Sequence, residues 1–489
     1  MIPMIALALP VLVALLLLAT RGALARGLAL AGAMGTFLAA ALLPGSSAVV
    51  VPWIAGIGVY FALDGSGAGG FLAVVASLVM VPTVVWTVVR VGERPHQFLA
   101  ALFAMWAGLI GLFLARDLVL FYVFWEVTLL PSLAMLAGWG LAQRRQAMLK
   151  YLLYAIAGSF AMLLTVLAIR PLAGAESYLF ADLLATTSAL DSVQQVWLFV
   201  GFVLAFAVKL PIFPVHHWLI DFHEQNHPSG AADVAGTLYK VGGFGLFAWA
   251  LPLLPLGASI VTPYLLLLGA FTALYAAVIA TRQTNLKRLL AYASLSHMGF
   301  VAVGLFGLHI AGLSGSMYLL AAQMVTTGGL FLLSGMLHAR RATFDITAYG
   351  GLAASAPALA AVMLLVLFAG IGVPGLANFP GEFLALLGAF QASVFAGVLA
   401  VGAVIAAGVY GVNLYGRLFQ GPQPNPVADL RPVEIAVLAP IVLATLWLGL
   451  FPAGPLALLD AEATITIEGQ SLASDPAPPD ASTLQGARR

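Results

Sequence analysis

Cysteine is absent from this 489-residue chain, and charged side chains are scarce, at 8% of all residues. The absence of cysteine excludes disulfides, thiolate metal sites and cysteine-ligated iron–sulfur clusters. Glycine-rich phosphate loops, nucleotide fingerprints and nucleophile triads are missing as well. With 62% hydrophobic residues and a mean hydropathy of +1.05, the chain has too little polar surface for a soluble protein. Composition therefore predicts a polytopic helical membrane protein.

Hydrophobic segments long enough to cross a bilayer recur along the whole chain. A crossing helix needs about 20 mostly apolar residues. Scanning for such segments predicts an all-α fold of about fourteen transmembrane helices. They lie near residues 2–20, 24–43, 69–89, 98–114, 117–138, 146–168, 196–222, 229–251, 263–280, 288–308, 312–337, 357–391, 393–418 and 432–452.

The order of these segments predicts how the chain is divided. We expect three N-terminal helices with an interfacial loop or hairpin at 45–68, a polar connection at 171–194, and a disordered tail rich in Pro, Asp and Ser. The predicted units are residues 1–97, a first five-helix repeat at 98–251, a second at 263–418, a last helix at 432–452 and the tail at 460–489.

Four ionisable residues lie inside apolar segments, where a bilayer disfavours them: Glu126, Lys209, Lys240 and Glu382. A charge at the centre of a transmembrane helix costs about 2.5 to 3.5 kcal/mol even on an insertion scale. Such residues normally face a bundle interior or a water-filled cavity. The sequence therefore predicts an ion path.

Two segments are interrupted in the same manner, each beside one of these charges. Pro211 and Pro214 break a helix just after Lys209, and Pro374 and Pro380 break another just before Glu382. Each break frees backbone groups that only protein or water can satisfy. Because the broken members are the fourth in each five-helix unit, the pattern predicts inverted repeats around a conduction site, with helices 7 and 12 broken.

The distribution of positive charge predicts an orientation. Cytoplasmic loops carry the Lys and Arg excess. Fourteen of the 20 basic residues lie in or beside the loops after odd-numbered helices. They are Arg21, Arg26, Arg90, Arg94, Arg144, Arg145, Lys150, Arg282, Lys287, Arg288, Arg340, Arg341, Arg417 and Arg431. Both termini should therefore lie on the non-cytoplasmic side.

Several of these segments also resemble a known family. The stretch QTNLKRLLAYASLSHMGF at 283–300 is similar to a signature of the proton-translocating, antiporter-like subunits of respiratory complex I, shared with Mrp-type antiporters and membrane-bound hydrogenases. FWEVTLLPS at 124–132, KLPIFPVHHWL at 209–219, GTLYKVGGFGL at 236–246 and NFPGEF at 378–383 follow the order of that family. A Glu in the twelfth helix, and no long amphipathic helix after residue 452, resemble the M-type subunit, the fourth ND chain.

The resemblance implies a role in proton translocation for each matching charge. Glu126 should pair electrostatically with Lys209 as a gate, Lys240 should be the connecting site and Glu382 the terminal site. His297 corresponds to the family's histidine in the tenth helix, where it would be a proton relay or a structural hydrogen-bonding residue.

Two positions depart from the family pattern. Thr327 stands in the eleventh helix where the family usually has His, so that relay step would be water-mediated or lost. Asn285 replaces an expected Asp before Lys287.

The resemblance also implies partners and a location. The chain would be a proton-translocating subunit of NADH:quinone oxidoreductase in a bacterial inner membrane, beside the L-type and N-type antiporter-like subunits. It would hold no cofactor and no metal itself, because FMN, iron–sulfur clusters and quinone would bind to partner subunits. The alternative is a subunit of a Mrp-type cation/proton antiporter or of a membrane-bound hydrogenase.

An alternative from another class is an intramembrane zinc metalloprotease. HEQNH at 223–227 is a formal HExxH, in which two histidines four residues apart on a helix can bind zinc. Pro228 disfavours helical geometry at His227, and no third ligand is evident. His216, His217, Asp221 and Glu224 could instead form a polar mouth for proton entry or a plain solvated loop.

Overall fold

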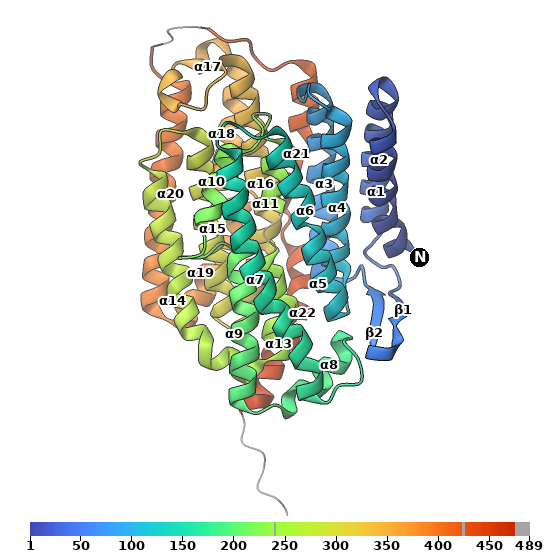
Figure 1. Ribbon diagram of the computed structural model, residues 1–489. Coiled ribbons are helices and arrows are strands. Elements are labelled where there is room, and N and C mark those ends of the chain that lie inside the picture. Colours follow the sequence, from blue (N-terminus) through green and yellow to red (C-terminus); the bar gives the residue numbers. More distant parts are fainter. Residues whose placement is uncertain (239–240, 423–425, 475–489) are drawn as a thin grey trace, which may run out of the picture.

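The protein is a bundle of long helices whose axes are roughly aligned, with a small β-hairpin at one end (Figure 1). The structure is a computed structural model that describes residues 1–238, 241–422 and 426–474, with the side chains of 470–474 excepted. Within these residues thirteen helices are long and apolar enough to cross a membrane, and the broken pair at 357–392 supplies a further candidate crossing. The prediction of a polytopic all-α fold is confirmed.

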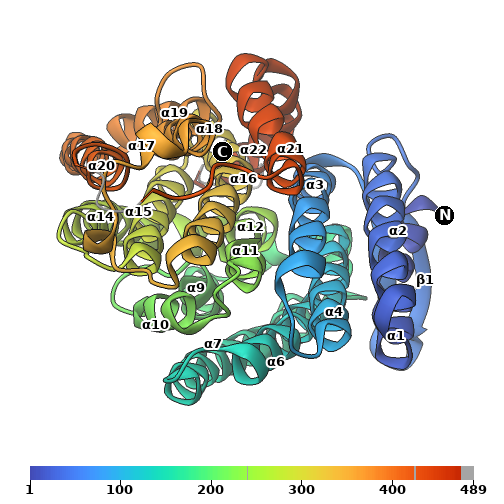
Figure 2. The same cartoon turned by 90° about the horizontal axis from the view of Figure 1, so that it is seen from above.

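The N-terminal part forms one side of the bundle, where α1 and α2 lie apart from most other helices (Figure 2). Its elements are α1 (Ile2–Ala19), α2 (Gly22–Ala41), β1 (Val49–Ile54), β2 (Val59–Leu63) and α3 (Gly67–Arg90). β1 and β2 pair antiparallel, with Val49 opposite Leu63. The expected hairpin at 45–68 is therefore present.

The part of the chain that was predicted as the first repeat contains several short helices. Its elements are α4 (Pro95–Leu114), α5 (Leu118–Val127), α6 (Leu129–Trp139), α7 (Arg144–Ala173), α8 (Phe180–Thr186), α9 (Ser192–Lys209), α10 (His217–Gln225), α11 (Ala231–Leu238), α12 (Gly242–Gly245) and α13 (Leu251–Leu253). A π-helical turn, Leu246–Ala250, joins α12 to α13. The segment predicted as one helix at 117–138 is divided at Thr128 into α5 and α6.

The second unit includes the most deeply buried helices of the bundle. Its elements are α14 (Pro255–Ala280), α15 (Leu286–Phe306), α16 (Ile310–Arg341), α17 (Leu352–Ser355), α18 (Pro357–Gly370), α19 (Asn378–Ala392) and α20 (Val394–Phe419). The apolar windows of α15 and α16 are buried throughout. A polar side chain on either helix therefore faces protein rather than lipid.

Both predicted helix breaks are present. Residues 210–216 separate α9 from α10, and residues 371–377 separate α18 from α19. Proline has no N–H to donate to the helix, which explains the interruptions at Pro211, Pro214 and Pro374. Pro380 differs, because it lies inside the first turn of α19, where a missing N–H costs little. Each break places a charge at a helix end inside the bundle.

The C-terminal part contradicts one prediction. After α21 (Pro432–Leu450), residues predicted to be a disordered tail form α22 (Ala453–Ser474). Leu459, Ala463 and Thr466 are buried, and this i, i+4, i+7 spacing gives one narrow face that packs on α16 and α3. Glu462 pairs with Arg116 at 3.7 Å. The prediction was wrong for 460–474, because this segment packs on neighbouring helices and forms an ion pair. Residues 475–489 lie outside the described residues.

Candidate functional site

Lys209 ends α9 in the bundle interior, with its side chain 3% exposed. Its Nζ donates hydrogen bonds to the carbonyl oxygen of Trp125 at 3.0 Å and to Oγ1 of Thr128 at 3.2 Å. The ammonium also lies 3.8 Å from the ring centroid of Trp125. The division between α5 and α6 at Thr128 leaves backbone groups there without regular helical partners. The ammonium of Lys209, at the end of α9, is therefore held at the point where α5 ends and α6 begins.

Glu126 lies next to Trp125 and is partly buried. Its Oε1 is enclosed but accepts no hydrogen bond within the described residues. Glu126 interacts electrostatically with Lys209, although no salt bridge of 4 Å or less joins the two side chains within the described residues. The expected pairing is thus a longer-range attraction. When a carboxylate lies near a buried ammonium without touching it, a small movement of the carboxylate changes the stability of the positive charge on the ammonium.

Lys240, the predicted connecting site, lies outside the described residues. The glycines that follow it are described, and Gly242 faces α9 closely, since a Cβ there would lie 2.3 Å from the carbonyl oxygen of Phe206. The π-helical turn begins four residues further on. Single π turns inside helices often occur at functional sites.

Glu382 and His297 meet across two helices of the second unit. His297 Nδ1 on α15 lies 2.9 Å from Glu382 Oε1 on α19, although their angles are not those of a hydrogen bond. The two side chains are 3% and 6% exposed. On the other side of the imidazole, Nε2 lies 3.3 Å from the hydroxyl of Tyr410 on α20. A carboxylate, an imidazole and a phenol therefore form a line through the bundle.

Tyr410 was not identified from the sequence. It is 2% exposed, and its ring is enclosed by apolar helices. Buried tyrosines usually find a partner for the hydroxyl, so the two tyrosines within the apolar segment 393–418, Tyr410 and Tyr415, were the available signal.

A small cavity adjoins this line of three residues. It is lined by the polar residues Ser294, His297, Thr327 and Tyr410 and otherwise by apolar residues, with about 10 Å³ open to a water centre. That is about the room needed for one water molecule. Thr327 Oγ1 lies 2.5 Å from Oε1 of Gln323, whose Nε2 is enclosed without a partner in the described residues. The threonine thus stands at the cavity where the family's histidine was expected.

A second buried group of charges joins the two units. Asp233 on α11 lies 2.7 Å from Lys287 Nζ through Oδ2 and 3.1 Å from His223 Nδ1 through Oδ1. All three side chains are 0% exposed. Lys287 also donates to the carbonyl oxygen of Asn226 at 3.0 Å. Sequence reasoning missed Asp233 and assigned Lys287 to a positively charged loop, whereas Lys287 is completely buried.

The HEQNH motif does not have the geometry of a zinc site. α10 ends at Gln225, so His227 is not on the same helix as His223. His223 faces Asp233, and His227 Nδ1 lies 2.9 Å from Ser229 Oγ. In the residues that the structure describes, no group of three His, Asp or Glu side chains could hold a metal ion. The sequence HEQNH therefore matches HExxH by chance, and its histidines are not arranged as in a metalloprotease centre.

The expected polar mouth is occupied by ion pairs. Asp221 pairs with Lys150, and Glu224 Oε2 lies 2.7 Å from Arg288 NH1. His216 is 0% exposed and His217 is exposed. Burial, together with the positive charge of Lys287, lowers the pKa of His227 to about 4, so this loop imidazole is neutral at pH 7 and has no extra proton to transfer.

Comparisons with known proteins place this arrangement in one family. The family model described as NADH:quinone oxidoreductase/Mrp antiporter, TM, matches residues 115–406, a range that contains Glu126, Lys209, Lys240, His297 and Glu382. NADH-quinone oxidoreductase subunit 13 of Thermus thermophilus is 45% identical over 403 residues, covering 82% of this chain and 84% of the relative. Subunit M of Rhodobacter capsulatus is 34% identical, covering 82% and 80%.

Solved structures agree with these relatives. A chain of respiratory complex I from Thermus thermophilus with bound NADH superimposes with a TM-score of 0.91 at 41% identity, covering 96% of this chain and 100% of that one. A chain of the Mrp complex from Dietzia sp. DQ12-45-1b superimposes at 0.84, covering 100% and 59%, but at 19% identity this likeness concerns the fold alone.

Buried charges at helix breaks within such a bundle define a class of membrane subunit that moves ions. This chain belongs to the NADH:quinone oxidoreductase/Mrp antiporter transmembrane family.

Proposed function

We propose that this chain is the M-type proton-translocating subunit of an NADH:quinone oxidoreductase. The observation that carries the proposal is the set of buried ionisable groups at the helix breaks, in a chain 45% identical to a subunit of that enzyme over most of both lengths. Redox chemistry takes place in other subunits, and this chain moves protons in response. FMN, iron–sulfur clusters and quinone belong to those partners.

The two units divide the work. Glu126 and Lys209 form the input pair of the first unit, Lys240 connects the units, and Glu382 with His297 forms the terminal group of the second. The equivalent breaks at 210–216 and 371–377 support a pair of inverted repeats, each with one broken helix at its centre. Proton loss from Lys209 follows when Glu126 is neutralised or moves away.

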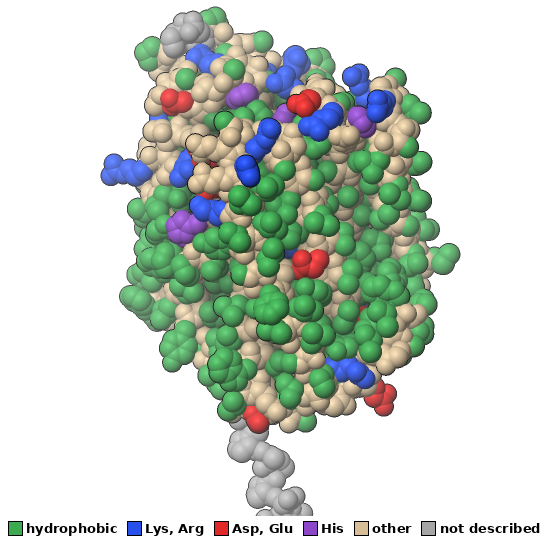
Figure 3. Space-filling model, viewed as in Figure 1, with side chains coloured by type: hydrophobic (Ala, Val, Ile, Leu, Met, Phe, Trp, Pro, Cys, Tyr) green, Lys and Arg blue, Asp and Glu red, His purple; other side chains and the backbone are tan. Residues whose placement is uncertain are grey.

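The chain lies in a bacterial inner membrane with both termini on the non-cytoplasmic side. Lys and Arg side chains gather at one end of the molecule, and hydrophobic side chains cover its middle (Figure 3). The basic end is then cytoplasmic. Neighbours in the membrane are the L-type and N-type antiporter-like subunits. A subunit of a Mrp-type antiporter is less well supported, because the solved Mrp relative resembles this chain only in fold.

The test is NADH-driven proton uptake by inverted membrane vesicles that carry Glu126→Gln. We expect proton uptake to fall while the complex still assembles. Glu176→Gln is the control, since Glu176 is exposed in the loop before α8. Uptake equal to that of the unaltered chain, with normal assembly, would reduce Glu126 to a structural residue and contradict the proposed path.

A further inference from the structure

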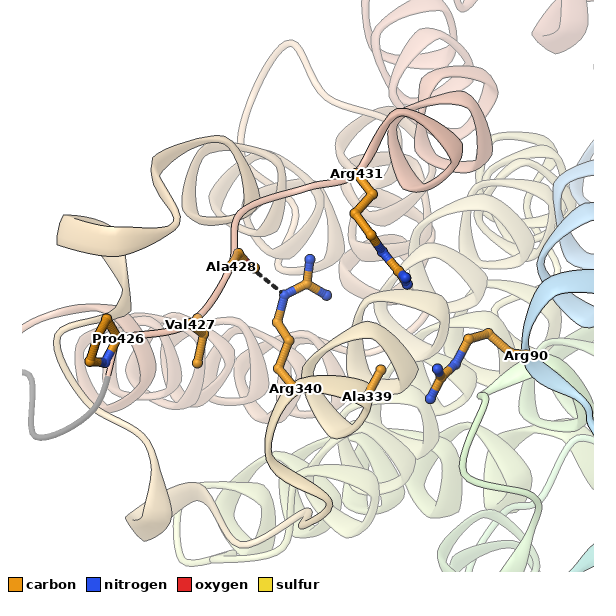
Figure 4. Close-up of a pocket in the computed structure, with 7 residues that line it drawn as sticks. All are labelled: Arg90, Ala339, Arg340, Pro426, Val427, Ala428 and Arg431. Carbon is orange, nitrogen blue, oxygen red and sulfur yellow. Dashed lines mark hydrogen bonds between the residues drawn. The ribbon is translucent and has the colours of Figure 1, made fainter.

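A basic cavity of about 370 Å³ opens at the end of the bundle where α3, α16 and α21 meet (Figure 4). Arg90 ends α3, Arg340 lies in the last turn of α16, and Arg431 precedes α21. All three line the cavity. Its volume is within the range of about 300 to 1,000 Å³ that is typical of small-molecule sites.

Of the three arginines, Arg340 makes the most hydrogen bonds to other groups in the described part of the chain. Arg340 holds Glu434 through two contacts, at 2.7 and 3.0 Å, and donates to the carbonyl oxygens of Ala428 and Asp429. Arg431 reaches the same carboxylate at 3.4 Å and is 53% exposed. Glu434 is completely buried, and Asp429 is a second carboxylate that interacts with Arg340. Three cations against two carboxylates leave an excess of positive charge at the cavity.

Arg90 has the strongest need for an external partner. Its guanidinium lies 5.7 Å from the ring of Trp86, and its Nε is buried without a hydrogen-bond partner in the described residues. Arg431 and Arg340 repel its charge, whereas Glu434 attracts it. An enclosed donor on a cation that faces two further cations is complementary to an anionic oxygen.

An apolar groove of about 540 Å³ lies in the same seam between α3 and α21, further into the bundle. Leu78 on α3 and Leu443, Ala444 and Trp447 on α21 line it. Leu443 is 67% exposed and Trp447 49% exposed, so the groove is open outward. The two helices lie side by side at the edge of the bundle in both views (Figures 1 and 2).

The spacing of cavity and groove matches the shape of a lipid. Leu78 precedes Arg90 by twelve residues, which is about 18 Å along a helix. One leaflet of the hydrocarbon core is about 15 Å thick. An anionic headgroup and an acyl chain of one molecule can therefore occupy the cavity and the groove together.

We propose that this seam binds an anionic phospholipid, with its phosphate between Arg90 and Arg431 and one acyl chain in the groove beside Leu443. The charge of the cavity favours a phosphodiester, and the groove below it offers apolar side chains alone. Basic pockets between transmembrane helices are a common setting for such headgroups. The proposal does not depend on the proton path, which runs through other residues.

The experiment is native mass spectrometry of the purified complex after exchange into mixtures of phosphatidylglycerol and phosphatidylcholine. We expect one tightly retained phosphatidylglycerol on this chain. Arg90→Gln combined with Arg431→Gln should weaken its binding about thirtyfold, the loss expected for two arginines. Neither change removes the contacts between Arg340 and Glu434, so the fold should persist.

Matched variants separate this site from general surface charge. Arg21→Gln with Arg26→Gln removes two exposed arginines near the same end and should leave binding unchanged. Ala444→Phe fills the groove and should weaken binding, whereas Val409→Phe on exposed α20 should not. Equal retention in the Arg90/Arg431 variant, or equal loss in the Arg21/Arg26 variant, would overturn the proposal.

Two further outcomes would also overturn the proposal. Displacement of the lipid by millimolar inorganic phosphate would make this a phosphate site and overturn the acyl-chain assignment. Retention by the isolated chain but not by the complex would show that a partner subunit covers the seam, and would overturn the proposal for the assembled enzyme.

Discussion

His297 Nδ1 and Glu382 Oε1 lie 2.9 Å apart, in a bundle where each side chain is almost completely enclosed. They come from α15 and α19, which pack against each other although they are not consecutive in the sequence. Tyr410 lies at the opposite ring nitrogen. An imidazole between a carboxylate and a hydroxyl can accept a proton at one nitrogen and release one at the other. This geometry is the basis for the first two predictions.

Replacing Glu382 by Gln should abolish most coupled proton transport. The amide keeps the shape of the side chain but removes the carboxylate charge that lies 2.9 Å from His297 Nδ1. We expect NADH-driven proton uptake by inverted vesicles to fall to about a tenth or less. Electron transfer measured with an uncoupler present reports whether the complex is intact. Undiminished uptake would remove Glu382 from the path.

Tyr410→Phe tests the third member of the line. The change removes one hydroxyl and leaves the ring, so His297 loses its contact at Nε2. A hydrogen bond contributes about 1 kcal/mol, and we expect proton uptake to fall about fivefold. Tyr415→Phe, five residues further along α20, is the control because its ring packs on Phe419 instead of lying beside His297. A purely structural Tyr410 would lower stability without altering the ratio of protons to electrons.

Asp233→Asn should destabilise the protein strongly. The change leaves the ammonium of Lys287 buried at 0% exposure without its carboxylate. Breaking such a pair costs about 3 to 5 kcal/mol, measured as a shift in the unfolding midpoint of the purified chain. Adding Lys287→Met should restore part of the loss. Asp221→Asn breaks a partly exposed pair with Lys150 and should cost about 1 kcal/mol or less. Similar losses in both variants would contradict this account.

The sequence predicted the crossings and the helix breaks because both depend on local chemistry. Apolar length identifies a span, and proline interrupts one, as residues 210–216 and 371–377 confirm. The charges Lys209 and Glu382 were found for the same reason, since each stands inside an apolar run. These features need no knowledge of which helices are neighbours.

What the sequence could not give depends on helix rotation and on contacts between distant segments. Lys287 follows a polar loop and reads as a surface cation, yet the rotation of α15 directs it to Asp233. Tyr410 can contact His297 only because α20 lies beside α15. α22 continues into a polar segment that did not suggest a helix, and it is stabilised by a buried face and by Arg116, nearly 350 residues earlier in the chain.

Gly372→Ala should impair proton transport beyond its effect on stability. Gly372 lies in the break before α19 with φ +76°, and a Cβ there would come within 2.0 Å of Glu382 Oε2. Gly375 is the matched control, because it has φ +86° in the same break and no atom within 4 Å of an added Cβ. Both alanine variants accept the left-handed conformation at a cost of about 1 to 2 kcal/mol, so their unfolding midpoints should fall alike. Only Gly372→Ala forces the carboxylate of Glu382 to move away from its present position. We therefore expect proton uptake to fall severalfold for Gly372→Ala and to remain nearly normal for Gly375→Ala. Equal uptake in the two variants would mean that the position of this carboxylate does not limit transport.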